Sequence, residues 1–262
     1  PDVVAPEASY ADLFLETAET FPDSPAVHFM GVTLPYRRLN DLSARFAAYL
    51  KSCGCVPGDT VGINLPNIPQ YLIALVGALR CGCAVTGISP LLTASEMAYQ
   101  INDSNTKFLV TLDAIFEHRL REVGGEVPCL KHIAGANIGD YIPVVKRTLG
   151  KLLKKIPTGK LVSLPGMEVI PFKKIMATSS PDISPVYIDP EDTCLLQYTG
   201  GTTGVAKGAM LSHHNLVSNT RSVMAGLQFQ PREDRLLVVL PMFHSFAATV
   251  GMLTPEIGRA SC

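Results

Sequence analysis

The chain has 262 residues, which is enough for one large hydrophobic core or two smaller ones. Its 22 basic and 23 acidic side chains nearly balance, which argues against general nucleic-acid binding. Hydrophobic residues make up 47% of the sequence, and two stretches without charged residues, Thr60–Leu79 and Leu236–Pro255, are long enough to cross a bilayer. Both stretches contain prolines and internal polar side chains, so we interpret them as buried elements of a folded core.

The cysteine pattern indicates reduced thiols. Seven cysteines include the pairs Cys53/Cys55 and Cys81/Cys83, each separated by one residue. This spacing matches neither a zinc knuckle nor a redox pair. Residues 1–9 are acidic and lack an apolar core, so no signal peptide is expected. We therefore expect a cytoplasmic protein without a metal-ligating cysteine set.

In chain order, strand patterns alternate with helix patterns, which is typical of parallel sheets flanked by helices. The predicted helices are Ala11–Phe21, Leu39–Cys53, Asn67–Arg80, Ala94–Asn102, Ile115–Val123 and His213–Gly226. The predicted strands are Pro25–Phe29, Thr60–Leu65, Ala84–Ile88, Lys107–Thr111, Leu130–Ala134 and a buried Arg235–Leu240, with a hairpin return at Gly31–Tyr36.

The region 140–192 interrupts this alternation. Tyr141–Lys160 holds six basic residues and no acidic one, with aliphatic residues between them. This composition predicts a basic amphipathic helix, which either contacts an anionic membrane surface or packs on its own domain. Pro181, Pro185 and Pro190 then predict an extended linker. We thus expect a first α/β subdomain at 1–139, a basic insert and linker at 140–192, and the start of a second, incomplete α/β subdomain at 193–262.

The stretch Leu195–Leu216 predicts a strand, a small-residue loop, a short strand and a helix. Glycines let the backbone approach phosphate oxygens closely, hydroxyls add donors, and a lysine offsets the negative charge. The loop is not a Walker A sequence, because Lys207 follows Ala206 and precedes Gly208. The candidate phosphate-binding residues are Thr199, Gly200, Gly201, Thr202, Thr203, Gly204 and Lys207.

The string Tyr198–Gly208 resembles the signature loop of the adenylate-forming superfamily, although many members have serine at position 201 and proline at 206. With Ser212-His213-His214-Asn215-Leu216 after it, the loop resembles most the version found in long-chain fatty acid CoA ligases. Leu65–Tyr71 and Ser89–Met97 resemble segments that are mainly scaffold in that family. The resemblance implies an acetyl-CoA-synthetase-like N-terminal domain, truncated here.

The resemblance further implies chemistry in two steps. A fatty acid carboxylate attacks the α-phosphate of ATP, with Mg²⁺, and the CoA thiol then displaces AMP. Lys207 would follow the departing pyrophosphate, and His244, in a Pro-x-x-His turn, would help to position the carboxylate. An apolar acyl pocket would lie near Phe243 and Phe246. We interpret His213 and His214 as residues at the start of a helix.

The family segments expected to bind adenine, ribose and magnesium would lie beyond Cys262, so we expect an N-terminal fragment that is inactive alone. Three alternatives remain open: a ligase of the same superfamily for medium-chain or aromatic acids, a non-catalytic lipid- or membrane-surface module, and a piece without a function of its own. The sequence does not predict an oligomeric state.

Overall fold

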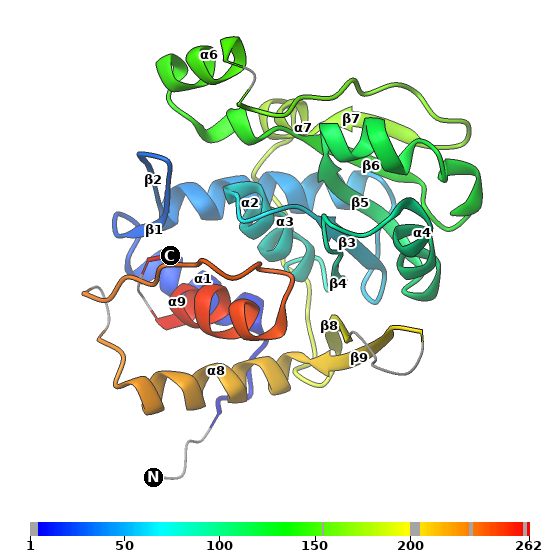
Figure 1. Cartoon of the computed structure of the whole chain (residues 1–262). Coiled ribbons are helices and arrows are strands. Elements are labelled where there is room, and N and C mark those ends of the chain that lie inside the picture. Colours follow the sequence, from blue (N-terminus) through cyan, green and yellow to red (C-terminus); the bar gives the residue numbers. More distant parts are fainter. Residues whose placement is uncertain (1–4, 154, 200–204, 231–232, 259–260) are drawn as a thin grey trace.

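A computed structural model describes residues 5–153, 155–199, 205–230, 233–258 and 261–262 (Figure 1). The first elements form a helix, a β-hairpin and a long helix: α1 (Tyr10–Thr20), β1 (Pro25–Phe29), β2 (Val32–Pro35) and α2 (Tyr36–Ser52). The central elements are β3 (Thr60–Asn64), α3 (Pro69–Leu79), β4 (Ala84–Gly87), α4 (Ala94–Asp103), β5 (Thr106–Leu112), α5 (Asp113–Ile115), a π-helical turn (Phe116–Leu120), a 3₁₀ turn (Gly124–Glu126) and β6 (His132–Ala136).

The later elements include two strands that end and begin at the glycine-rich loop. They are a 3₁₀ turn (Ile138–Tyr141), α6 (Val144–Leu152), β7 (Glu168–Pro171), α7 (Phe172–Thr178), β8 (Thr193–Thr199), β9 (Lys207–Ser212), α8 (His213–Leu227), a π-helical segment (Ala247–Leu253) and α9 (Thr254–Gly258). Ser9, Thr93 and Ser212 each cap a helix through a reciprocal hydrogen-bonded box, which explains where α1, α4 and α8 begin.

Seven strands form one sheet in the order β7-β6-β5-β3-β4-β8-β9. All neighbouring pairs are parallel except β8 and β9, which form an antiparallel pair around the glycine-rich loop. The predicted α/β class, with a mainly parallel sheet and flanking helices, is confirmed. Strands β8 and β9 join the same sheet as β3–β6, so the sheet itself marks no boundary near residue 192; the predicted division into subdomains stays a prediction.

Helices cover both faces of the sheet, and successive residues of β5 show how. Phe108 and Val110 pack into the larger core with α1, α2 and α3, whereas Leu109 packs into the second core under α4 and the turn 116–120. This alternation follows from the two-residue period of a strand. Every residue of β3 and α3 is buried, so the uncharged stretch Thr60–Leu79 is a buried core segment, as predicted.

The region 140–192 differs from its prediction in two ways. Helix α6 covers only Val144–Leu152 of the expected Tyr141–Lys160 segment, and β7 and α7, which the sequence analysis missed, follow it. Strand β7 is short and half-exposed at the margin of the sheet. Its alternation of apolar and polar residues is therefore too weak to predict a strand from the sequence. Phe172 and Ile175 of α7 are buried against the larger core.

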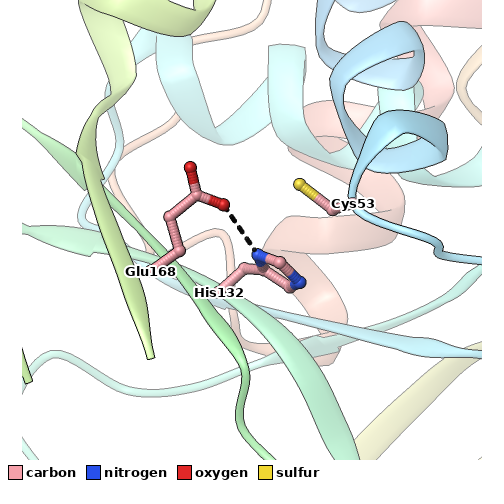
Figure 2. Close-up of side chains that lie close together, drawn as sticks. All are labelled: Cys53, His132 and Glu168. Atoms are coloured by element: carbon pink, nitrogen blue, oxygen red, sulfur yellow. Dashed lines mark hydrogen bonds and ion pairs between the residues drawn. The ribbon is translucent and has the colours of Figure 1, made fainter. Parts of the chain in front are cut away.

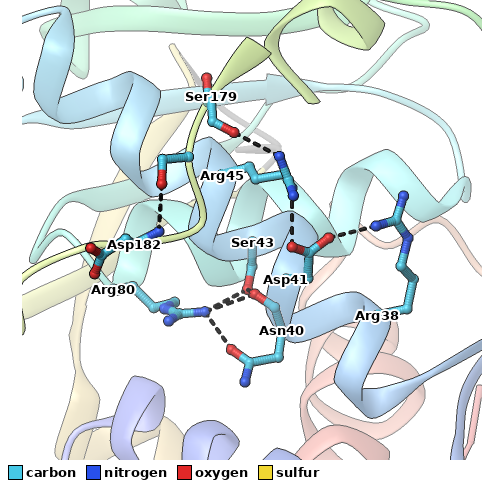
Figure 3. Close-up of polar contacts among 9 residues, drawn as sticks. Arg38, Asn40, Asp41, Ser43, Arg45, Arg80, Ser179 and Asp182 are labelled. Carbon is cyan, nitrogen blue, oxygen red and sulfur yellow. Dashed lines mark hydrogen bonds and ion pairs between the residues drawn. The ribbon is translucent and has the colours of Figure 1, made fainter. Parts of the chain in front are cut away.

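The chain after α7 is fixed to α2 by a polar network (Figure 3). The Arg45 guanidinium donates to the carbonyl oxygen of Ser179 at 2.7 Å and to the Asp41 carboxylate at 3.0 Å. The same view shows Arg80, whose Nη1 donates to Asn40 and Ser43 of α2 and joins α3 to that helix. The extended linker thus has a fixed course over α2.

The prediction of a buried strand at Arg235–Leu240 is wrong. Arg235 makes one isolated bridge to Ser261, and residues 236–239 have no strand partner in the described part of the chain. Leu237 is 87% exposed and Val239 is 75% exposed. The aliphatic pattern is that of a strand, but a strand needs a neighbouring strand to pair with its backbone groups. Within the described ranges no strand lies there, and the segment bonds instead to Ser261 and to the Asn67 side chain.

Candidate active site

The flanks of the glycine-rich loop, at Thr199 and at Val205–Ala206, and the Pro-x-x-His turn lie together at the carboxyl ends of β4 and β8. They line a cavity of about 760 Å³, which is within the usual range for small-molecule sites. Its lining residues come from β4 and the segment after it, from α4, from both ends of the loop and from the turn: Gly87, Ser89, Leu92, Ser95, Glu96, Tyr99, Gln100, Gln197, Tyr198, Thr199, Val205, Ala206, Phe243, His244 and Ser245. The carboxyl edge of a mainly parallel sheet is where such folds place ligands.

The predicted order of strand, loop, strand and helix is confirmed by β8, β9 and α8. Thr199 and Lys207 are register partners at the open end of the β8–β9 pair, and both are exposed. Tyr99 Oη donates to the Ala206 carbonyl oxygen at 3.0 Å and so holds the end of the loop against α4. Gly200–Gly204 lie outside the described residues, and their predicted role stays a prediction.

Tyr198 and Gly208 are register partners just inside the loop. A Cβ atom on residue 208 would lie 2.9 Å from Cε2 of Tyr198, so glycine is needed for the tyrosine ring to cross this position. The hydroxyl of Tyr198 donates to Asp103 at the end of α4. Burial, followed by the bond to Asp103, raises the pKa of Tyr198. The ring therefore remains a neutral hydrogen-bond donor that joins the loop to α4.

The turn that carries His244 is held by Asn67, from the segment between β3 and α3. Asn67 Nδ2 donates to the carbonyl oxygens of Val238 and Leu240 at 3.1 and 2.9 Å, and its Oδ1 accepts from the Met242 N–H at 2.9 Å. The Gln197 side-chain amide of β8 also donates to the Phe243 carbonyl oxygen at 3.2 Å. One asparagine and one glutamine thereby fix the turn relative to the sheet.

His244 itself is exposed at the cavity, and its Nδ1 accepts from the Phe246 N–H at 3.4 Å. Phe243 lies half-buried in the lining. Phe246 is 58% exposed and is not among the lining residues, although it lies only two positions from His244. Phe243 and His244 are thus brought to one cavity, whereas Phe246 points elsewhere in this structure; the predicted roles of all three stay predictions.

Gly87, at the end of β4, shows how closely the turn approaches the sheet. A Cβ atom there would lie 2.8 Å from the Tyr71 hydroxyl and 3.1 Å from Cα of Phe243. The Gln100 side-chain amide donates to the Gly87 carbonyl oxygen at 3.1 Å and to Thr86 Oγ1 at 3.0 Å. These bonds fix α4 against the strand end that forms the cavity floor.

Sequence reasoning missed the lining and clamping residues outside the two motifs, mainly Asn67, Tyr99 and Gln100. It treated the segments that contain Asn67 and Ser89–Met97 as scaffold. A usable signal was present, because polar residues that directly follow buried strands collect at the carboxyl edge of a parallel sheet. The partner of each polar residue, however, depends on contacts between segments far apart in the chain.

His213 and His214 begin α8, as predicted. His213 is buried, and its Nδ1 accepts from the Tyr10 N–H at 3.1 Å, which ties α8 to α1. Burial lowers the pKa of His213 to about 4, because the charged imidazolium would lose its hydration. This neutral histidine has a structural contact and does not line the cavity.

Among the described lining residues Glu96 is the one carboxylate, and it is engaged in capping α4. Glu96 Oε2 accepts from the N–H and Oγ1 of Thr93, both at 2.8 Å, and these bonds lower the pKa of Glu96. A magnesium site normally combines carboxylates with phosphate oxygens and water. The described lining therefore offers Mg²⁺ a single carboxylate, which already caps α4. Among the helices in the described ranges, none is both long and apolar enough to span a membrane.

The fold and the cavity between loop and turn define the class of protein. The solved structure of the anthranilate CoA ligase AuaEII in complex with anthranoyl-AMP superposes with a TM-score of 0.79 at 19% identity, covering 98% of this chain and 44% of that chain. The chain thus has the fold of the N-terminal part of adenylate-forming enzymes. Residues 14–262 match the AMP-binding enzyme family, and the chain belongs to that family.

The curated relatives agree with this assignment. The chain is 35% identical over 250 residues to a long-chain-fatty-acid–CoA ligase of Escherichia coli O157:H7, covering 94% of this chain and 44% of the relative. It is 28% identical over 220 residues to 4-coumarate–CoA ligase 2 of Petroselinum crispum, covering 83% and 35%. The recognition made from the signature loop is confirmed, and the chain spans less than half the length of these relatives.

Proposed function

We propose that this chain is the N-terminal part of a long-chain fatty acid CoA ligase, which activates a fatty acid with ATP and transfers the acyl group to CoA. The observation that carries this proposal is the cavity shared by the flanks of the phosphate loop and His244. Sequence similarity to long-chain-fatty-acid–CoA ligases favours an aliphatic substrate. Similarity to a 4-coumarate–CoA ligase supports an aromatic acid as an alternative substrate. A medium-chain acid is a further alternative.

In the proposed reaction, the carboxylate oxygen forms a bond to the α-phosphorus of ATP while the bond to the β-phosphate breaks and pyrophosphate leaves. The CoA thiol then loses its proton to solvent, its sulfur forms a bond to the acyl carbon, and the bond from that carbon to the AMP oxygen breaks. Negative charge on the leaving phosphates requires fixed donors and a cation. Lys207 would supply the cation, and Thr199 with the residues 200–204 would supply donors, because the β8–β9 pair holds both ends of this loop at the cavity.

His244 would orient the acid. Since Nδ1 accepts the Phe246 N–H, a neutral His244 carries its proton on Nε2 and can donate it to a carboxylate or phosphate oxygen. Asn67 and Gln197 would act through the turn, as positioning residues. Bound Mg²⁺ would neutralise phosphate charge, but the described lining provides no ligand set for it, so we assign it no residue and no step.

The experiment is mass spectrometry of this chain incubated with Mg-ATP and an equimolar mixture of short, medium, long-chain and aromatic acids. The longer gene product that contains this sequence is tested beside it, with CoA. We expect acyl-CoA from the longer protein only, with long-chain products dominant. Dominant aromatic products would favour the alternative, and acyl adenylate from the 262-residue chain would refute the proposal that it is inactive alone.

Variants of the longer protein test the residue roles. Lys207→Ala and His244→Ala are expected to lower kcat/KM by at least about 100-fold, the effect typical of losing one stabilising donor. Lys173→Ala, which removes an exposed lysine of α7, is the matched control and is expected to retain activity. Retention of activity in Lys207→Ala would contradict the proposed phosphate contact.

A specific observation also favours peripheral membrane contact through α6 and the residues after it, within the Tyr141–Lys160 segment. Val145 is 80% exposed and Leu152 is 78% exposed, and Val144, Leu149 and Leu153 are exposed as well. Apolar side chains among basic residues suit an anionic bilayer surface, which offers both charge complementarity and an apolar boundary. Lys146 Nζ donates to the Met30 carbonyl oxygen at 3.2 Å and anchors the helix to the β1–β2 hairpin.

Flotation with anionic and zwitterionic vesicles tests this contact in the 262-residue chain. Val145→Glu combined with Leu149→Glu is expected to reduce anionic-vesicle binding at least about tenfold, because two apolar anchors become charged. Leu237→Glu changes an equally exposed leucine outside α6 and is the control. Equal losses in both proteins would show non-specific adhesion, and unchanged binding of the double variant would refute the role of α6.

A further inference from the structure

Three side chains with metal-ligating atoms meet on the sheet face covered by α2 (Figure 2), and none of them lines the cavity described above. Cys53 directly follows α2, His132 is the first residue of β6, and Glu168 is the first residue of β7. The sulfur, one imidazole nitrogen and a carboxylate oxygen lie within 4.8 Å of one another. His132 Nδ1 and Glu168 Oε2 are 3.1 Å apart.

The sheet register fixes two of these residues. Phe108, His132 and Glu168 are neighbours across β5, β6 and β7, so their side chains form a row on one face. The Phe108 ring stacks on the His132 ring with a centroid distance of 5.9 Å and an interplanar angle of 15°. The imidazole is therefore held by packing before any ligand binds, and it is only partly exposed.

Helix α2 brings the third residue, with a second polar group beside it. Tyr49 lies one helical turn before Cys53, and its ring meets Phe108 edge-on with centroids 6.0 Å apart. Its buried hydroxyl lies beside the side chains of Cys53 and Glu168, with which it interacts electrostatically, and no other described group bonds to it. A buried hydroxyl at this place suits a hydrogen bond to a thiolate, a carboxylate or a water molecule of a metal site.

The donor set selects the class of metal. One thiolate, one imidazole and one carboxylate are ligands that Zn²⁺ accepts together, and three protein ligands leave a fourth position for water. Zinc bonds of about 2.0–2.3 Å place tetrahedral donors about 3.3–3.8 Å apart, so the cluster must contract by about 1 Å at its widest. Exposure of the Glu168 side chain leaves it free to make this adjustment.

We propose that Cys53, His132 and Glu168 form a mononuclear Zn²⁺ site. Binding forms a sulfur–zinc bond as the Cys53 S–H bond breaks, and the proton passes to solvent. Because the ligands come from the C-terminal cap of α2, from β6 and from β7, the metal ties the marginal strand β7 to the end of that helix. The site is independent of the proposed ligase activity, and its test does not require turnover.

Cobalt(II) is the probe, because its complexes with a thiolate absorb in the near ultraviolet and its tetrahedral complexes absorb strongly in the visible. The chelator-treated 262-residue chain is titrated with Co²⁺, and Zn²⁺ is then added as competitor. We expect one Co²⁺ per chain, a thiolate charge-transfer band, and displacement by Zn²⁺. Cys53→Ser is expected to abolish that band, and His132→Gln and Glu168→Gln to weaken binding at least about tenfold.

Cys129→Ser is the matched control, because Cys129 is a second partly buried free cysteine, which packs against the second core, whereas Cys53 packs against the larger one. It is expected to leave the spectrum and the stoichiometry unchanged. A second measurement uses the unaltered chain: Zn²⁺ should protect Cys53, and not Cys129, from alkylation read by mass spectrometry. Absence of one-to-one binding, survival of the charge-transfer band in Cys53→Ser, or lack of selective protection of Cys53 would overturn the proposal, even if a variant failed to fold.

Discussion

Burial of His213 predicts an acid-sensitive contact between α1 and α8. The side chain is 1% exposed, and Nδ1 accepts the Tyr10 N–H, which requires that nitrogen to be unprotonated. His213→Asn offers a shorter side chain whose amide oxygen can accept the same N–H but does not titrate in this range. The perturbation therefore removes the proton-binding group and keeps a hydrogen-bond acceptor.

The magnitude follows from linkage between protonation and folding. The pKa of His213 is lowered from 6.5 to about 4 in the folded chain, so the unfolded state binds the proton more readily in this window. Stability from this group is fully present above about pH 6.5 and is lost progressively as the pH falls toward about 4. The difference in pKa corresponds to about 3 kcal/mol in the free energy of unfolding.

The assay is urea denaturation followed by circular dichroism between about pH 7 and about pH 3. Relative to His213→Asn, the unaltered chain should lose about 3 kcal/mol over this range, and the loss should flatten below about pH 4. His118→Asn, at an exposed histidine, is the control and should retain the pH dependence of the unaltered chain. Parallel stability curves for the unaltered chain and His213→Asn would refute the reasoning.

Two further predictions concern the cavity walls. Asn67→Ala removes three hydrogen bonds that hold the turn of His244, and it should lower the free energy of unfolding in urea by about 1–3 kcal/mol. The control is Asn219→Ala, at an exposed position of α8, which should change the same free energy by less than about 0.5 kcal/mol. Gly208→Ala should lower the free energy of unfolding by about 1–3 kcal/mol, because the new methyl group crowds the ring of Tyr198. In the control Gly226→Ala, the methyl group meets open space in α8, so this substitution should leave the free energy of unfolding unchanged or raise it. In a double-mutant cycle, Gly208→Ala should destabilise the Tyr198→Ala variant less than it destabilises the unaltered chain, because the ring is gone. Equal destabilisation in both backgrounds would show that the ring of Tyr198 is not the source of the strain.

Local patterns predicted most regular elements closely. The predicted and observed bounds of β1 coincide, and α2, α3 and α8 differ from their predicted ranges by a few residues at their ends. These elements combine a strong apolar period with clear end signals, such as Pro69 at the start of α3 and Ser212 as the cap of α8. The class of fold follows from their alternation.

Patterns failed where a contact partner decides the structure. Leu236–Leu240 has the composition of a buried strand, yet Leu237 and Val239 are exposed because no described strand pairs with them. The opposite error occurred at β7, whose four residues give a weak signal but gain partners from β6. Strand formation depends on hydrogen bonds to a neighbour that is often distant in sequence, and a local window does not contain that neighbour.

The sequence by itself determined the order of most strands and helices and membership in the adenylate-forming superfamily, because each is carried by residues adjacent in the chain. For the same reason it could predict a phosphate-binding role for the glycine-rich loop, which stays a prediction. Only the tertiary structure decided that Asn67 clamps the turn of His244, that Tyr99 holds the end of the loop, and that His132 meets Cys53. These pairs are separated by many residues and join only when the sheet register and helix packing are set. Contacts of that kind arise from the whole fold, so no local pattern encodes them.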